Sequence, residues 1–219
     1  MFAAPLVLQS NKDVNKFTFF PMLDHNKEWQ KIQNAVENKN VQIQITKRQC
    51  TKASIQEILA QRPIAIHFSG HGILNNEAMG REFHEQHKDE GDFLVLESSN
   101  GSSELVSRKQ LQKMIEQNRC KLEFVFVATC HSEFVGKIFQ QAGALHVICI
   151  QHSEEVRDDA VIVFTEMFYS MLFEQNKKIC DAFQNAKMAV EISFGQAEAN
   201  IFKLLRKEDL HESERCSGF

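Results

Sequence analysis

Residues 123–128 read Glu-Phe-Val-Phe-Val-Ala, and this nearly unbroken apolar run decides the fold. A strand of a parallel sheet with both faces covered carries such a run, because neither face meets water. Similar stretches occur upstream, where residues 64–68 read Ile-Ala-Ile-His-Phe, and downstream over residues 145–150. These three stretches predict the buried strands of a central, mostly parallel sheet.

Segments with helical spacing of apolar residues alternate with the strands. Asp24 and Ser107 are N-cap residues of two predicted helices, and Ser54 with Glu57 forms the capping box of a third. The same spacing predicts further helices over residues 134–143, 158–174 and 179–192. Alternation of strands and helices predicts an α/β sandwich with helices on both faces of the sheet.

Three other segments complete the predicted chain. Residues 5–8, Pro-Leu-Val-Leu, are typical of a short buried strand, and the strict alternation of Val-Gln-Ile-Gln-Ile at 41–45 predicts a strand with one wet face. Residues 75–91 form a polar connection longer than most. It is either a solvated loop or a flap beside a site, since it follows the strand end that carries His71.

The composition fits one compact domain. The chain has 219 residues, a net charge of −4 and 43% hydrophobic residues, which is ample for a core. We expect a domain over residues 1–195 and a charged, peripheral C-terminal tail over 196–219. The weak negative charge gives no support for nucleic acid as a partner, since such binding rests on cationic contacts to phosphate.

The sequence also bears on the compartment. No apolar run approaches the ~20 residues of a membrane helix, and the N-terminal stretch lacks the basic region of a secretory signal. We therefore expect a cytoplasmic protein with no membrane partner. In a reducing compartment most of its six cysteines, which include no Cys-x-x-Cys pair, are expected to be buried or incidental thiols rather than a disulfide framework or zinc knuckle.

Two strand ends carry reactive side chains. Residues 67–72 read His-Phe-Ser-Gly-His-Gly, and residues 128–133 read Ala-Thr-Cys-His-Ser-Glu, so His71 and Cys130 each follow a buried strand. Ligands of open α/β sheets bind at the carboxyl ends of strands, which places both residues in one predicted cleft. A helix N-terminus after Cys130 favours the thiolate, and a neighbouring imidazole supplies a proton carrier.

These motifs resemble those of the CHAT family, caspase-like peptidases often fused to helical repeats, and more broadly those of the caspase–separase clan. The resemblance covers residues 41–190 and includes a third block, Val-x-Asp-x-Ala at 156–160. His71 and Cys130 are 59 residues apart (130 − 71 = 59), near the ~50 of caspases. The resemblance implies a three-layer caspase-like sandwich. True caspases have Gln-Ala-Cys-x-Gly, so cleavage after aspartate is not implied.

Carried over residue by residue, the resemblance implies an intracellular cysteine endopeptidase with a Cys–His dyad. Cys130 would be the nucleophile and His71 the general acid and base, while the backbone N–H groups of Gly72 and Cys130 would form the oxyanion hole. No third triad member can be identified in the sequence, and no cofactor is implied. The implied partners are a protein or peptide substrate, and regulatory repeat domains or partner proteins.

Asp158 has two interpretations. In separase-like enzymes a comparably placed aspartate faces a basic residue before the scissile bond, and a buried carboxylate in a pocket favours Arg or Lys. Asp158 is equally well placed to cap the helix that starts there. Cleavage after a basic residue is therefore one of two alternatives.

Three other functions fit parts of the pattern. A catalytically silent CHAT-like module would bind partners through the same fold, although it need not retain both His71 and Cys130. An acyl or thioester hydrolase would use the same dyad on a non-peptide substrate. A zinc site around Cys130 and its nearby histidines lacks the second pair of closely spaced ligands typical of structural zinc, so no metal is expected.

Overall fold

A computed structural model of the chain describes residues 7–9, 17–37, 43–75, 85, 90–99, 101–118 and 121–207, with the backbone alone for 7–9 and 17–19. In chain order its elements are β1 (Val7–Gln9), β2 (Phe17–Phe19), α1 (His25–Glu37), α2 (Lys52–Ala60), β3 (Ala65–Ser69), β4 (His71–Ile73), β5 (Phe93–Glu97), β6 (Ser103–Ser107), α4 (Arg108–Glu116), β7 (Phe124–Ala128), α5 (Glu133–Gln141), β8 (His146–Ile150), α6 (Asp158–Tyr169), the π-helix η2 (Ser170–Glu174), α7 (Ile179–Phe194), α8 (Gln196–Asn200) and β9 (Phe202–Arg206).

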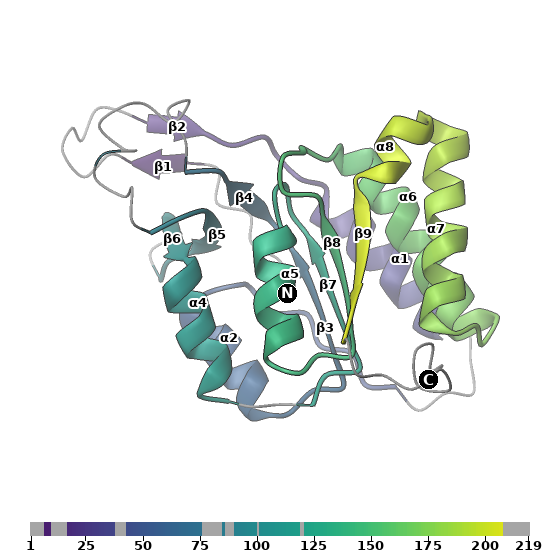
Figure 1. Cartoon of the computed structure of the whole chain (residues 1–219), viewed down its shortest axis with the longest axis horizontal. Coiled ribbons are helices and arrows are strands. Elements are labelled where there is room, and N and C mark those ends of the chain that lie inside the picture. The colour runs from purple at the N-terminus through teal and green to yellow at the C-terminus, as the bar shows by residue number, and fades with distance from the viewer. Residues whose placement is uncertain are drawn as a thin grey trace.

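The central layer is a four-stranded sheet in the order β3-β7-β8-β9 (Figure 1). β3, β7 and β8 are parallel, and β9 pairs antiparallel with β8. The three parallel strands are the ones that the apolar runs predict. Beside this sheet, β4, β5 and β6 form an antiparallel sheet, and β1 pairs with β2.

Helices cover both faces of the central sheet, with α2, α4 and α5 on one face and α1, α6 and α7 on the other (Figure 1). Successive side chains of a strand point to opposite faces. Val125 and Val127 accordingly pack in the first helical layer, whereas Phe124 and Phe126 pack in the second. The predicted three-layer α/β sandwich with a mostly parallel sheet is confirmed.

The layer of α1, α6 and α7 is built on aromatic rings. Phe164 of α6 stacks on Phe202 of β9, with ring centroids 4.3 Å apart, and meets Phe126 of β7 edge-on at 5.3 Å. Such pairs contribute about 0.5–1.5 kcal/mol each beyond the burial of their area. This stack therefore joins β9 firmly to the sheet.

The structure corrects two local predictions. Residues 43–48 form no regular element, so the strand predicted over 41–45 is wrong for the part that the structure describes. The capping box of α2 is formed by Thr51 and Ser54, since the Ser54 amide donates to Thr51 Oγ1 at 3.1 Å and the Thr51 amide donates to Ser54 Oγ at 2.9 Å. The predicted pair of Ser54 and Glu57 lies one turn too late.

The sheet continues beyond the predicted boundary at residue 195. Residues 196–206, which we expected in a peripheral tail, form α8 and β9, and β9 pairs with the whole of β8. Residues 208–219 of the expected tail lie outside the described residues, as do most of residues 75–91. Across the described ranges, no helix is both long enough and apolar enough to cross a bilayer.

Candidate functional site

The two predicted motifs lie at adjacent strand ends. β3 and β7 pair in register through Ser69 and Ala128, the last residue of each strand. The Gly70 amide then donates to the Ala128 carbonyl at 3.3 Å, and β4 begins at His71. Hydrogen bonding between the strands therefore brings the turn of the histidine motif to the end of the strand that carries the cysteine motif.

Gly72 and Cys130 are in direct backbone contact. A Cβ at residue 72 would overlap the Cys130 carbonyl oxygen, and it would lie 3.2 Å from the carbonyl carbon and 3.3 Å from Thr129 Oγ1. Only glycine permits so close an approach of two backbone segments. The structure thus brings His71, Gly72 and Cys130 together at one edge of the sheet, and their catalytic roles stay predictions.

The His71 imidazole is buried, with 8% of the residue exposed, and it stacks on Phe20 at 4.9 Å between ring centroids. Burial and then the charge of His25 lower its pKa from 6.5 to about 4, against a hydrogen bond with the Pro21 backbone. Nε2 is buried without a hydrogen-bond partner among the described residues, which leaves Nδ1 for Pro21. The ring is therefore a neutral base at neutral pH, with one nitrogen available.

The Pro21 backbone is the hydrogen-bond partner of the His71 imidazole. A backbone carbonyl can orient an imidazole as a side chain does, because it accepts the N–H bond that fixes the ring and its tautomer. Phe20 and Pro21 follow β2 directly and precede α1 by a few residues. No sequence signal marks a backbone group, so this contact could not be predicted.

The Cys130 thiol is half-buried and is held by Val156. The Val156 amide donates to Sγ at 3.4 Å, and Sγ lies 3.9 Å from the Val156 carbonyl oxygen. Burial raises the pKa of the thiol, although the Val156 hydrogen bond opposes this. The predicted bias toward thiolate is therefore wrong for this structure, because α5 starts only at Glu133 and desolvation prevails. No hydrogen bond joins this thiol to His71.

Ser132 and Glu133 attach the turn at residues 130–132, here called the cysteine turn, to the sheet. Ser132 is fully buried, and its hydroxyl donates to the Val127 carbonyl at 3.0 Å and accepts from the Ile150 amide at 2.8 Å. Glu133 pairs with Lys203 of β9 at 2.9 Å. Although burial opposes it, the lysine hydrogen bonds lower the pKa of Glu133 to about 2. The cysteine turn is thus anchored to β7, β8 and β9.

The segment after β8 wraps around the same turn. The His131 amide donates to the Glu154 carbonyl at 3.2 Å, and His131 Nδ1 lies 3.0 Å from the His152 carbonyl oxygen. The His152 amide in turn donates to the Glu133 carboxylate at 3.1 Å. These bonds place Val156, and with it the third predicted block, against Cys130.

Asp158 is the first residue of α6, whose N-cap is Arg157, so its predicted role as that helix's N-cap is wrong. Its carboxylate instead accepts the Asp24 amide at 3.0 Å, and Asp24 Oδ1 accepts the Lys27 amide in the first turn of α1. Burial raises the pKa of this half-buried carboxyl. Asp158 thus links two helix N-termini two residues from the Val156 contact with Cys130.

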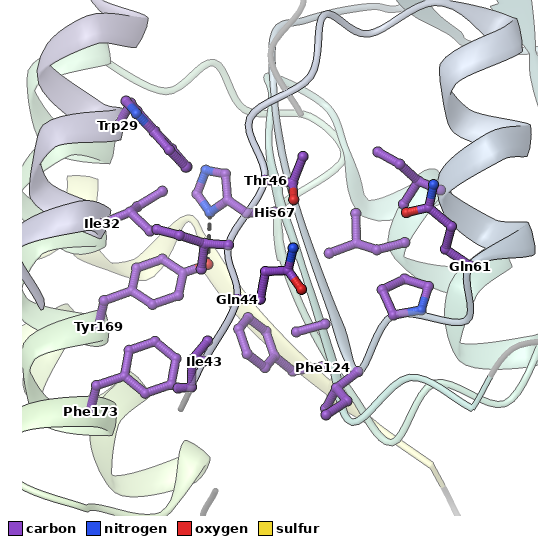
Figure 2. Close-up of a pocket in the computed structure, with 16 residues that line it drawn as sticks. Trp29, Ile32, Ile43, Gln44, Thr46, Gln61, His67, Phe124, Tyr169 and Phe173 are labelled. Carbon is purple, nitrogen blue, oxygen red and sulfur yellow. Dashed lines mark hydrogen bonds between the residues drawn. The ribbon is translucent and has the colours of Figure 1, made fainter. Parts of the chain in front are cut away.

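A buried polar network lies behind the site. His67 of β3 contacts Tyr169 Oη at 3.0 Å through Nδ1, drawn in Figure 2, and Glu28 Oε1 at 3.0 Å through Nε2. Thr165 Oγ1 donates to the same Glu28 oxygen at 3.3 Å. Although burial opposes it, the charge of His67 lowers the pKa of Glu28. His67 therefore connects β3 to α1 and α6. A single histidine in an apolar strand does not identify these partners in the sequence.

The cysteines differ in their surroundings. Among the described residues the free thiols are Cys50, Cys130 and Cys149, and of these only Cys130 is partly exposed. Burial raises the pKa of Cys149 to about 12, which makes that thiol inert. Cys180 is disulfide-bonded, so it is not among the thiols that we expected most of the cysteines to be.

A mostly parallel sheet between two helical layers, with a thiol and an imidazole on touching loops at its carboxyl edge, defines a caspase-like domain. The family model described as the CHAT domain matches residues 2–193, and the chain therefore belongs to the CHAT domain family. A search of curated proteins finds no significant match. The family resemblance of the sequence motifs is confirmed.

Proposed function

We propose that the protein is a cysteine endopeptidase in which Cys130 and His71 act as a dyad. The observation that carries this proposal is the backbone contact between Gly72 and Cys130, which puts the two motifs at one edge of the sheet. Nε2 of His71, which has no hydrogen-bond partner among the described residues, would be the proton acceptor, and the partly exposed Cys130 would be the nucleophile. Membership of a caspase-like family supports the same chemistry.

The proposed reaction has two steps. The Cys130 thiol transfers its proton to His71, sulfur attacks the peptide carbonyl carbon, and the C–N bond breaks as the imidazolium returns the proton to the leaving amine. A water molecule then hydrolyses the thioester, with His71 taking its proton and returning it to sulfur. The N–H groups of Gly72 and Cys130 would stabilise the oxyanion, for which one lost donor costs ~3 kcal/mol.

The resting geometry requires a change before this reaction. The thiol is held by the Val156 backbone, and its raised pKa keeps it protonated. The buried imidazole is neutral at neutral pH. Turning sulfur from Val156 toward His71 would start catalysis. We propose that the substrate, or a regulatory repeat domain or partner protein, provides this step.

Covalent labelling tests the nucleophile. A peptidyl acyloxymethyl ketone, called the acyl probe from here on, should label wild-type protein at Cys130. Cys130→Ala should abolish both labelling and turnover while retaining the fold. Cys149→Ala is the matched control, since Cys149 is fully buried and its variant should be labelled like wild type. Peptidase activity retained by Cys130→Ala would end the proposal.

A peptide library separates the peptidase from its nearest alternative. An acyl or thioester hydrolase would react with the acyl probe through the same Cys130 but would leave peptides intact. Cleavage of library peptides by wild type, and not by His71→Ala, is the result expected of a peptidase.

A catalytically silent interaction module is the second candidate. The specific observation in its favour is that Cys130 bonds to Val156 rather than to His71, with the pKa of the thiol raised. Such a module would react with the acyl probe no faster than an ordinary buried thiol. Equal, slow labelling of wild type and His71→Ala would therefore favour it.

We further propose Asp158 as the residue that favours a basic side chain before the scissile bond. Its half-buried carboxylate lies on the segment that touches Cys130, and a carboxylate there would pair with Arg or Lys. Wild type should cleave Arg-containing peptides faster than Asp-containing ones, and Asp158→Ala should lose this preference. A preference that is the same in both proteins would remove the assigned role.

A further inference from the structure

Segment 20–24, the chain between β2 and α1 in Figure 1, begins at the His71 ring. Phe20 stacks on that imidazole with ring centroids 4.9 Å apart and ring planes 21° from parallel. The Pro21 backbone forms a hydrogen bond with the same ring. The start of the segment is therefore fixed beside the proposed general base.

The end of segment 20–24 is fixed to Asp158. The Asp24 amide donates to the Asp158 carboxylate at 3.0 Å, and the Asp24 carboxylate caps the first turn of α1. Asp158 lies two residues after Val156, whose amide donates to Cys130 Sγ at 3.4 Å. The segment therefore runs from the proposed base to the residue that we propose selects the basic side chain of the substrate.

Met22 lies near the middle of this segment. It is 83% exposed, which is the largest value among the exposed large hydrophobic residues of the described ranges. Single exposed apolar side chains are ordinary on protein surfaces. The position of Met22 is what distinguishes it, because the residues on both sides of it contact groups of the candidate site.

The length of segment 20–24 is that of a short piece of substrate. An extended chain spans at most ~3.6 Å per residue, so the three steps from Pro21 to Asp24 cover no more than about 11 Å. A peptide bound in extended form covers this distance with about three residues. A substrate that places a basic side chain at Asp158 would therefore bring a residue within about two positions of it next to Met22.

We propose that Met22 is a specificity-determining residue, which contacts an apolar side chain of the substrate near the basic one. This inference rests on the proposed function and defines the substrate class more closely, as a peptide with a large apolar residue within two positions of Arg or Lys. The unbranched thioether of methionine adapts to apolar and aromatic partners of different shapes. Binding would remove this exposed side chain from water, which favours an apolar partner over a polar one.

A peptide library tests the contact. Each peptide carries Arg before the scissile bond and either Leu or Ser at one of the two positions on each side of it. At one position wild type should prefer Leu about 10-fold in kcat/KM, because loss of an apolar contact costs that much or more. Met22→Ser should lose the preference, and Met22→Leu should keep it. No Leu preference in wild type, or an equal one in Met22→Ser, would overturn the proposal.

Met188→Ser is the matched control, because Met188 is 60% exposed and lies on α7. It should keep the Leu preference of wild type. Both methionines are exposed, so both serine variants should unfold at the wild-type urea midpoint. Loss of the preference in Met188→Ser as well would show that the effect does not depend on the position of Met22, and would overturn the proposal.

Peptide binding to Cys130→Ala separates this proposal from the peptidase reaction. Fluorescence anisotropy of a labelled peptide with Leu at all four positions around Arg should give a Kd about 10-fold weaker when Met22→Ser is added. Such weakening in a protein whose wild type cleaves no peptide would support the contact and reject the endopeptidase. Equal binding with and without Met22→Ser would reject the contact, whether or not wild type cleaves peptides.

Discussion

At Gly72 the backbone has no room for a side chain. Gly72→Ala would drive a methyl group into the Cys130 carbonyl, and because this neighbour is backbone it cannot turn aside. We expect the cysteine turn to shift and labelling of Cys130 by the acyl probe to slow roughly 100-fold, since misplacement by ~1 Å can cost that much. The second-order rate of labelling measures the effect.

Gly136→Ala is the matched control. A Cβ there would lie 3.0 Å from Cys149 Sγ, 3.1 Å from Leu205 Cδ1 and 3.2 Å from Cys149 Cβ, which are side-chain atoms and are farther away than the Cys130 carbonyl oxygen is from a Cβ at residue 72. Alanine also stabilises a helix interior by ~1 kcal/mol relative to glycine. We expect near wild-type labelling from this variant. Equal labelling of Gly72→Ala and Gly136→Ala would mean that the Gly72 contact does not position Cys130.

The imidazole of His71 predicts a pH dependence of stability. Its pKa falls from 6.5 to about 4 on folding, so between these values the unfolded chain binds a proton that the native protein does not. Stability is therefore fully present above pH 6.5 and declines as the pH falls toward 4. Urea midpoints at pH 7 and pH 4.5 should differ more for wild type than for His71→Gln.

His152→Gln is the control for this titration, because the His152 side chain is 55% exposed. Its loss of stability between pH 7 and pH 4.5 should match that of wild type. His25, whose pKa burial also lowers, retains part of the effect in His71→Gln. If His71→Gln and wild type lose the same stability, the ring is protonated in the native state over this range.

The positions of the candidate site residues in the fold could be predicted, but their environments could not. His71 and Cys130 follow apolar strands, and parallel strands deliver their carboxyl ends to one edge. The contacts of Pro21 with the imidazole and of Val156 with the thiol join segments far apart in the chain. Because desolvation by such segments sets the pKa, the sequence predicted a thiolate bias that the fold reverses.

Among the elements, the cysteine turn depends on one buried hydroxyl. Ser132 accepts from the β8 residue Ile150 and donates to the β7 residue Val127, and it is fully buried. Ser132→Ala leaves an amide and a carbonyl without this partner, which costs ~1–3 kcal/mol for an unsatisfied buried group. We expect a loss of that size in the free energy of unfolding, measured with urea.

Ser153→Ala tests whether the loss reflects burial. Ser153 is exposed and its hydroxyl donates to the Glu154 side chain at 3.2 Å, so its removal should change stability by less than ~0.5 kcal/mol. A similar loss in both variants would argue that the bonds of Ser132 contribute little to the turn.

The strands that the sequence predicted well are the apolar ones, β3, β7 and β8. β7 is apolar on both faces because both helical layers cover it, and this leaves a clear signal. β9 was missed because an edge strand carries charge without penalty. Its Lys203 and Arg206 resemble a charged tail in the sequence, yet Lys203 pairs with Glu133 beside the site. β9 is therefore an edge strand that composition conceals, whereas the apolar edge strand β3 was predicted.

On the scale of the whole molecule, β9 connects the C-terminal helices to the sheet and to the cysteine turn. Phe202→Ala would remove a ring that is 2% exposed and stacked on Phe164, which costs ~3–5 kcal/mol for a buried aromatic. Ile192→Ala on α7 is the control, since Ile192 is 80% exposed and its loss should cost under ~0.5 kcal/mol.

A chain ended at Gly195 would leave the β8 edge and Phe164 bare, so we expect it to lose its cooperative urea transition. If that shortened chain unfolds with the wild-type midpoint, residues 196–206 are dispensable and the sheet is complete without β9.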